Sequence, residues 1–139
     1  MTAYWAHFSH GADIGVRGIG TTPAAAFEQA ALALVGVITA PEQLATQQEI
    51  EIECHAPDLE FLLYDWLNAL ICEMATRKML FGRFQISIEN NHLRAKLGGE
   101  PADQAKHQPV VEVKGATYTE LAVYQGADGL WLAQCVVDV

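Results

Sequence analysis

The stretch Leu59–Lys78, LEFLLYDWLNALICEMATRK, decides the fold of this 139-residue chain. Its apolar residues recur at spacings of three and four, which is the period of a helix with one wide buried face. These residues are Leu59, Leu62, Leu63, Trp66, Leu67, Leu70, Ile71 and Met74. Asp58 can cap the first turn of this helix. Because Phe61 and Cys72 extend the apolar surface toward a second side, we expect the helix to lie at the centre of the fold.

A second apolar helix is expected upstream, from Pro23 to about Ile38. Thr22 can cap it with its hydroxyl, and Pro23 suits the first helical position, where its missing N–H costs nothing. The helix should end before Pro41, because a proline disfavours helical geometry in the residue that precedes it.

Most of the remaining segments alternate as strands do. In QEIEIECHA, residues 48–56, Ile50 and Ile52 face one way and Glu49, Glu51 and Glu53 face the other, which predicts a half-buried strand with a solvated acidic face. Further strands are expected at residues 4–8, 13–19, 84–88, 93–97, 110–125 and 130–139. Residues 98–109, GGEPADQAKHQP, read as a polar loop and the one segment expected to be mobile.

Together these elements predict an α+β fold with two helices and about seven or eight strands, in a single domain over residues 1–139. A helix with a broad apolar face must bury that face against another layer. Two such helices in one chain, together with apolar strands near its end, predict helices packed between β-sheets.

The charge balance limits the classes of partner. Seventeen acidic residues against eight basic ones give a net charge of −9, so the surface repels phosphate backbones. Direct tight binding of nucleic acid is therefore not expected, whereas basic partners and divalent cations are favoured.

Cysteine usage and hydropathy predict a soluble cytoplasmic protein. The three cysteines, Cys54, Cys72 and Cys135, are odd in number and widely spaced, which predicts reduced core residues rather than a disulfide framework. The first ten residues lack the pattern of a secretory signal, and the longest apolar stretch is too short and too rich in alanine to span a bilayer.

Two aspartates near the ends of the chain form the candidate metal site. Asp13 lies between two glycines in HGADIGVRG, and Asp138 ends an apolar run, one residue before Val139 and its α-carboxylate. If their strands are neighbours, the three carboxylates would form an oxygen-only site suited to Ca²⁺, Mg²⁺ or Mn²⁺ rather than zinc. Taken singly, Asp13 is better explained as a turn residue and Asp138 as the solvated end of a strand, and spacing alone does not show that they meet.

Nothing in the sequence indicates an enzyme. The chain has no phosphate-binding glycine loop, no G-x-S-x-G turn, no C-x-x-C pair and no His or Cys pairs at zinc spacing. In the long helix, Asp65 and Asn68 are expected to make a structural polar contact with a neighbouring segment. Glu112 and Lys114 are expected to point outward, as a cross-strand ion pair of small worth.

Four stretches, in order, resemble the archease family: HGADIGVRG at 10–18, LLYDWLNALI at 62–71, VEVKGATYTEL at 111–121 and GLWLAQCVVDV at 129–139. The resemblance covers essentially the whole chain. It implies a three-layer β/α/β fold and a protein cofactor of the tRNA-splicing RNA ligase that joins ends through a guanylated ligase histidine. Such a cofactor promotes guanylation and multiple turnover of the ligase without itself joining RNA. The resemblance also implies a metal site at Asp13, Asp138 and Val139, with Ca²⁺ as the expected ion and Mg²⁺ or Mn²⁺ as alternatives.

This chain departs from the resemblance at two positions. Gly11 stands where many relatives have Thr, and Thr119 stands where many have His; neither change removes a mapped metal ligand. His10, Glu112 and Lys114 are further candidates for a surface that faces the ligase.

Two other functions stay open on the sequence. A general chaperone or adaptor would use the acidic surface and the loop at residues 98–109. A small metal-dependent hydrolase would use the carboxylates and would need a cleft with a perturbed base.

Overall fold

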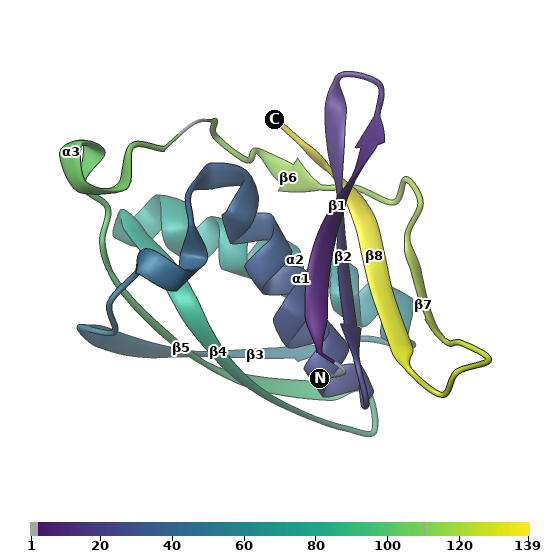
Figure 1. Ribbon diagram of the computed structural model, residues 1–139. Coiled ribbons are helices and arrows are strands. Elements are labelled where there is room, and N and C mark those ends of the chain that lie inside the picture. Colours follow the sequence, from purple (N-terminus) through teal and green to yellow (C-terminus); the bar gives the residue numbers. More distant parts are fainter. Residues whose placement is uncertain (1–2, 110) are drawn as a thin grey trace.

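The computed structural model describes residues 3–109 and 111–139, in which two long helices lie between two antiparallel sheets (Figure 1). The strands are β1 (Tyr4–His10), β2 (Asp13–Gly20), β3 (Gln48–His55), β4 (Met79–Glu89), β5 (His92–Pro101), β6 (Gly115–Ala116), β7 (Ala122–Gln125) and β8 (Trp131–Asp138). The helices are α1 (Pro23–Ile38), the short 3-10 helix η1 (Pro41–Gln43), α2 (Leu59–Arg77) and the single-turn α3 (Gln104–His107).

The two sheets form the outer layers. The larger has the order β1-β2-β8-β6, with β7 also paired to β8, and the smaller has the order β3-β5-β4. The last strand of the chain, β8, is therefore internal and lies directly beside β2. Helix α1 packs against both sheets, with β2 and β8 on one side and β4 on the other (Figure 1). This confirms the expected α+β fold with helices packed between β-sheets.

The helix boundaries follow the predicted signals. The hydroxyl of Thr22 accepts a hydrogen bond from the N–H of Ala25 at 3.1 Å, and the carboxylate of Asp58 accepts one from the N–H of Phe61 at 2.8 Å. These caps satisfy N–H groups in the first turn that have no partner within the helix.

Trp66 joins the layers at the centre of the core. Its side chain is fully buried, its indole N–H donates to the carbonyl of Phe27 in α1 at 3.3 Å, and its ring meets Phe84 of β4 edge-on at 5.9 Å. The α2 side chain thus contacts the other helix and the smaller sheet at once, which is why α2 is central.

We expected Phe61 and Cys72 to extend the buried face of α2, and this expectation was wrong. Phe61 is 42% exposed and Cys72 is exposed, so neither extends the buried face. All three cysteines are free thiols, as predicted, but only Cys135 is a buried core residue, since Cys54 is half-buried and Cys72 is exposed. Trp66 and its leucine neighbours bury the helix instead, because they lie on the stripe between the two sheets.

Two segments near the C-terminal end differ from the prediction. The strand expected over 110–125 is mostly loop: only Gly115–Ala116 and Ala122–Gln125 pair with β8, and Val110 lies outside the described residues. The loop expected over 98–109 begins with the last residues of β5 and contains α3. Strand pairing and a buried glutamate, described below, order this second segment, and neither feature can be read from its polar composition.

Within residues 3–109 and 111–139, no helix has both the length and the apolar character needed to cross a membrane.

Candidate functional site

Two predicted site residues lie at the same end of the larger sheet. Asp13 is the first residue of β2, and Asp138 is the last residue of β8. Their neighbours Ile14 and Val137 are register partners, so the next position sets Asp13 against Asp138. Side chains that are directly opposite in an antiparallel pair share one face, with their Cβ atoms about 4.5–5.5 Å apart. Continued by one residue, this register places Asp13 and Asp138 at neighbouring strand ends, and Val139 follows Asp138 directly.

This pair lies on the face of the sheet that is turned away from the helices. A side chain at Gly18 would strike the backbone of α1, whereas a side chain at Gly15 would strike the ring of Phe8 on the outer face. Asp13 is two residues from Gly15, so strand alternation puts it on that outer face. Asp13 is half-buried and Asp138 is exposed. The two carboxylates therefore lie at an open sheet end, which suits contact with a macromolecule better than enclosure of a small substrate.

The donor chemistry of this sheet end fits a hard divalent cation. Like charges directly opposite each other destabilise a sheet, and in the described part of the chain neither Asp13 nor Asp138 forms an ion pair. No three His, Cys, Asp or Glu side chains of the described residues are grouped as metal ligands. The predicted set has two such side chains, and its third member is the α-carboxylate of Val139. Carboxylate oxygens are the ligands that Ca²⁺, Mg²⁺ and Mn²⁺ prefer.

The further surface candidates lie around the same sheet end. His10 is the register partner of Asp13 in the β1–β2 hairpin and is exposed. The backbone N–H of Lys114 donates to the carbonyl of Asp138 at 2.8 Å, and its side chain is exposed, like that of Glu112. Neither Glu112 nor Lys114 forms an ion pair within the described residues, so the expected cross-strand pairing is wrong, because this segment is not a strand.

Both positions that depart from the resemblance have clear local surroundings. Gly11 forms the β1–β2 turn with φ +59°, a backbone conformation that glycine adopts without strain. The carbonyl of Thr119 accepts a hydrogen bond from the N–H of Val136 in β8 at 3.0 Å, and Thr119 is exposed. The turn therefore depends on the backbone conformation of Gly11, and the contact with β8 depends on the backbone carbonyl of Thr119.

Asn68 of α2 fixes the segment beside Asp138, as expected of a structural polar residue. Its carboxamide oxygen accepts from the N–H of Ala116 at 3.0 Å, and its NH₂ group donates to the carbonyl of Ala116 at 3.2 Å. Gly115, the preceding residue, is the register partner of Asp138. The side chain of Asn68 therefore pairs with β6 as another strand would, and ties α2 to the end of β8.

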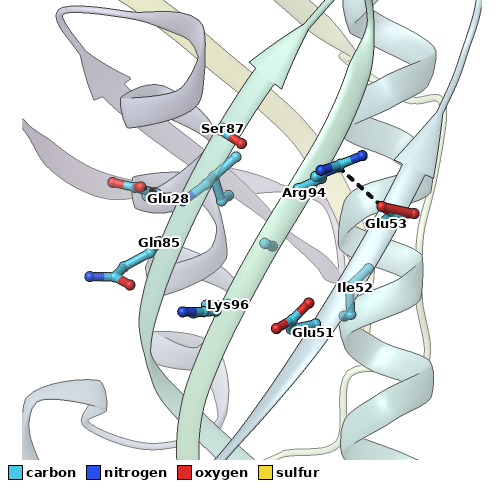
Figure 2. Close-up of a pocket in the computed structure, with 10 residues that line it drawn as sticks. Glu28, Glu51, Ile52, Glu53, Gln85, Ser87, Arg94 and Lys96 are labelled. Atoms are coloured by element: carbon cyan, nitrogen blue, oxygen red, sulfur yellow. Dashed lines mark hydrogen bonds and ion pairs between the residues drawn. The ribbon is translucent and has the colours of Figure 1, made fainter.

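A shallow pocket of about 490 Å³ lies over the smaller sheet (Figure 2). Figure 2 shows Glu53 of β3 paired with Arg94 of β5, and their atoms are 3.1 Å apart. Lys96 lies opposite Glu51 in the strand register. The acidic row of β3 thus faces bases on β5, which supports the prediction of a solvated acidic face rather than a metal site. Exposed pairs of this kind contribute little to stability.

Glu28 of α1 borders the same pocket and covers a sheet edge. Its carboxylate accepts a hydrogen bond from the N–H of Ile86 in the edge strand β4 at 2.8 Å. Burial raises the pKa of Glu28, while the hydrogen bond from Ile86 opposes that rise. This contact satisfies an edge N–H that could otherwise pair with another chain.

A buried carboxylate that the sequence did not reveal orders the segment after β5. Glu100 is 2% exposed, and its oxygens lie 2.5 Å from the ammonium of Lys106 and 2.8 Å from the N–H of Ala45. The hydrogen bond from Lys106, followed by that from Ala45, lowers the pKa of Glu100 to about 2. Nε2 of His107 lies 3.4 Å from the carboxylate oxygen that accepts from Ala45, so two residues of α3, Lys106 and His107, contact this glutamate of β5.

A second feature missed from the sequence is an exposed aromatic cluster of Phe61, Tyr64 and Tyr118. The rings of Tyr64 and Tyr118 stack with centroids 4.3 Å apart, and Phe61 meets Tyr118 edge-on at 5.9 Å. The spacing of Phe61 and Tyr64 places them on one helix face, which could have been read from the sequence. Tyr118 comes from a loop distant in the chain, and no local pattern predicts that contact.

Comparisons with known proteins agree with this architecture. Residues 5–139 match the family described as the Archease protein family (MTH1598/TM1083). The chain is 42% identical to "Protein archease" of Pyrococcus furiosus, over 97% of this chain and 98% of the relative. It is 39% identical to "Protein archease" of Sulfolobus acidocaldarius, over 95% and 96% of the two chains.

Solved structures show the same fold. The solution structure of protein 1598 of Methanobacterium thermoautotrophicum has a TM-score of 0.79 and 28% identity, covering 97% of this chain and 98% of that one. A crystal structure from Thermotoga maritima, described as an archease and possible chaperone, has a TM-score of 0.59, with 19% identity, and supports the fold alone. Because the family model matches residues 5–139 and these relatives are 42% and 39% identical over nearly their full length, the chain belongs to the archease family.

Proposed function

We propose that this chain is a protein cofactor of the guanylate-dependent tRNA-splicing RNA ligase, and that Asp13, Asp138 and the carboxylate of Val139 hold a divalent cation, with Ca²⁺ as the expected ion. The observation that carries the proposal is the register of Ile14 with Val137, which puts Asp13 and Asp138 at neighbouring strand ends of an open sheet edge. Family membership supports a protein partner, and the acidic charge of the chain suits a basic, RNA-binding enzyme.

The chain's own residues have distinct roles in this proposal. Asp13 and Asp138 supply oxygens from neighbouring strands, and the β1–β2 and β6–β8 pairings hold those strand ends in place. When bound, the cation neutralises the carboxylates and adds a positive charge to an acidic surface. His10 and Lys114 flank the pair and contact the ligase. Ligation itself takes place on the partner.

The first test measures cation binding without the ligase. Wild-type protein should melt at a higher temperature in Ca²⁺ or Mn²⁺, because ligand at a hundred times its Kd adds about 2.7 kcal/mol to the free energy of unfolding. Asp13→Asn and Asp138→Asn should lose this response, while Glu49→Gln, which removes an exposed charge from the other sheet, should keep it. Adding one glycine after Val139 should weaken the response. Equal midpoint shifts in all variants would exclude the site.

The second test is a ligase guanylation assay with the same variants. Asp13→Asn and Asp138→Asn should stimulate guanylation and multiple turnover far less than wild type and Glu49→Gln. Full stimulation by both aspartate variants would refute the role of this sheet end.

A general chaperone is the alternative, and the Thermotoga structure of the same fold is described as a possible chaperone. The fold removes one argument for it, because residues 98–109 are held by β5 pairing and by Glu100. A chaperone would suppress the aggregation of an unrelated heat-denatured protein, and Asp13→Asn would do so equally well. A cofactor of the ligase would not protect such a client.

A further inference from the structure

The exposed aromatic cluster defined above is organised before any partner arrives. Tyr118 is 61% exposed and Phe61 is 42% exposed, although both contact other aromatic rings. Single exposed apolar side chains are ordinary, whereas stacked groups of them mark interaction sites. Phe61, Tyr64 and Asp65 are three and four residues apart, so they share one face of α2.

The loop that carries Tyr118 is pinned on both sides. The hydroxyl of Thr117 donates to the carbonyl of Val136 at 2.8 Å, and the N–H of Thr119 donates to that hydroxyl at 3.1 Å. The side-chain amide of Gln134 donates to the carbonyl of Glu120 at 3.1 Å. A partner that binds here therefore meets a preformed surface and loses little conformational entropy in ordering it.

The chain segments that carry the cluster hold only acidic charges, and Arg17 reaches their edge through Gln134. Residues 56–76 and 115–139 contain seven Asp and Glu residues and no Lys or Arg. Asp65 is exposed beside Tyr64. The hydrogen bond with Tyr118 is the largest cause of the raised pKa of Tyr64, and the charge of Asp65 makes the smallest contribution. Aromatic faces beside a carboxylate attract a planar guanidinium, which stacks on the rings and pairs with the acid. The same field repels phosphate, so a nucleic acid base is a poorer occupant.

We propose that Phe61, Tyr64, Tyr118 and Asp65 form a docking surface for an arginine side chain of a basic partner protein. This surface shares no residue with the proposed metal site. Tyrosine and arginine are the residue types that dominate protein interfaces, and a preformed tyrosine stack provides the aromatic half of such a contact. Where the partner is the RNA ligase, this inference rests on the proposed function.

Arginine recognition is tested first with short peptides, independently of any ligase. An acetylated, amidated Gly-Arg-Gly-Arg-Gly peptide is titrated into the protein, with lysine and citrulline versions as probes of charge and shape. The arginine peptide should shift the ring NMR signals of Phe61, Tyr64 and Tyr118, and its Kd should be at least several times lower than that of the lysine peptide. The citrulline peptide should not shift these signals. Equal shifts with lysine, shifts spread over the acidic surface, or shifts of these rings by an oligouridylate would overturn the proposal.

Variants then separate the cluster from general acidity. Tyr118→Ala should weaken peptide binding about tenfold, the loss typical of an interface anchor. Asp65→Asn, at an exposed helix position that does not threaten folding, should weaken it several-fold. Tyr124→Ala removes a tyrosine that is 52% exposed in the same acidic region and should leave binding unchanged. A Tyr124→Ala loss equal to that of Tyr118→Ala would overturn the proposal.

A ligase experiment extends the test and keeps the two proposals distinguishable. If wild type stimulates guanylation, Tyr118→Ala should need about tenfold more protein for half-maximal stimulation and reach the same maximum; an unchanged requirement would overturn the docking surface. If wild type does not stimulate the ligase, the proposed function fails, and the peptide titration alone decides the docking surface.

Discussion

Replacement of Asn68 by alanine should uncouple α2 from the strand that pairs with Asp138. Asn68 supplies both hydrogen-bond partners of Ala116, at 3.0 and 3.2 Å, and also donates to the carbonyl of Tyr64 at 3.1 Å. Ala116 is 6% exposed, so its N–H and carbonyl lose their partners in a largely dry environment. The substitution adds no new atoms, and its effect therefore reports the lost hydrogen bonds.

The magnitude follows from these two backbone groups. A buried polar group left without a partner costs about 1–3 kcal/mol, and the half-buried position of Asn68 lets some water return, so the pair should cost about 2.5 kcal/mol. Alanine recovers about 0.5 kcal/mol through its higher helix propensity. The expected loss in the free energy of unfolding is about 2 kcal/mol, equivalent to a fall of about 7 °C in Tm for a chain of this length.

Urea unfolding followed by circular dichroism measures this loss. Gln125→Ala is the matched control, because Gln125 also donates through its amide, to the carbonyl of Gly129 at 3.0 Å, but at an exposed turn. That variant should lose less than about 0.5 kcal/mol. An Asn68→Ala loss no larger than that of Gln125→Ala would show that Asn68 does not hold β6, and the account of how the strand end is fixed would be refuted.

Three further measurements test other parts of the fold. Glu100 has a pKa of about 2 when folded, below its ordinary 4.5, so its contribution to stability is complete above about pH 4.5 and is lost as the pH falls toward 2. The loss of stability in Glu100→Gln relative to wild type should therefore shrink over that range. A loss that stays constant with pH would contradict this. Gly18→Ala should lower the free energy of unfolding by about 3 kcal/mol, because the added Cβ would lie 2.1 Å from a carbonyl oxygen of α1. Gly115→Ala is the control and should lower it much less, because the nearest atom to the added Cβ would be 3.7 Å away. At pH 8 a thiol reagent should modify the exposed Cys72 quickly and Cys135 only on unfolding, since burial raises the pKa of Cys135 to about 12; equal rates would place Cys135 near the surface.

Features governed by neighbouring residues were predictable from the sequence. The caps at Thr22 and Asp58 were each indicated by a local pattern, and Asn90-Asn91, between the strands predicted at 84–88 and 93–97, is a pair typical of a hairpin turn. Both asparagines adopt positive φ, at 51° and 58°, as a two-residue hairpin turn requires. Periodicity also predicted that both long helices need cover on more than one side, from which the layered fold followed.

Features that depend on distant segments were not predictable in this way. The exposure of Phe61 was misjudged because an apolar residue beside a buried stripe gives the same local signal whether a sheet covers it or not. Glu100 was read as part of a polar loop because its burial depends on Lys106 and Ala45, which fold against it from two different segments.

The sequence by itself determined the two long helices, their caps and the strands up to β5, since capping groups, glycine conformation and hydrophobic periodicity act over a few neighbouring residues. Only the tertiary structure decided that β8 lies beside β2, and so that Asp13 and Asp138 stand at neighbouring strand ends. Strand register depends on contacts across more than a hundred residues of chain, and it is fixed by burying Val16 and Val137 against the helices. A shift of one residue would expose those side chains and separate the two carboxylates.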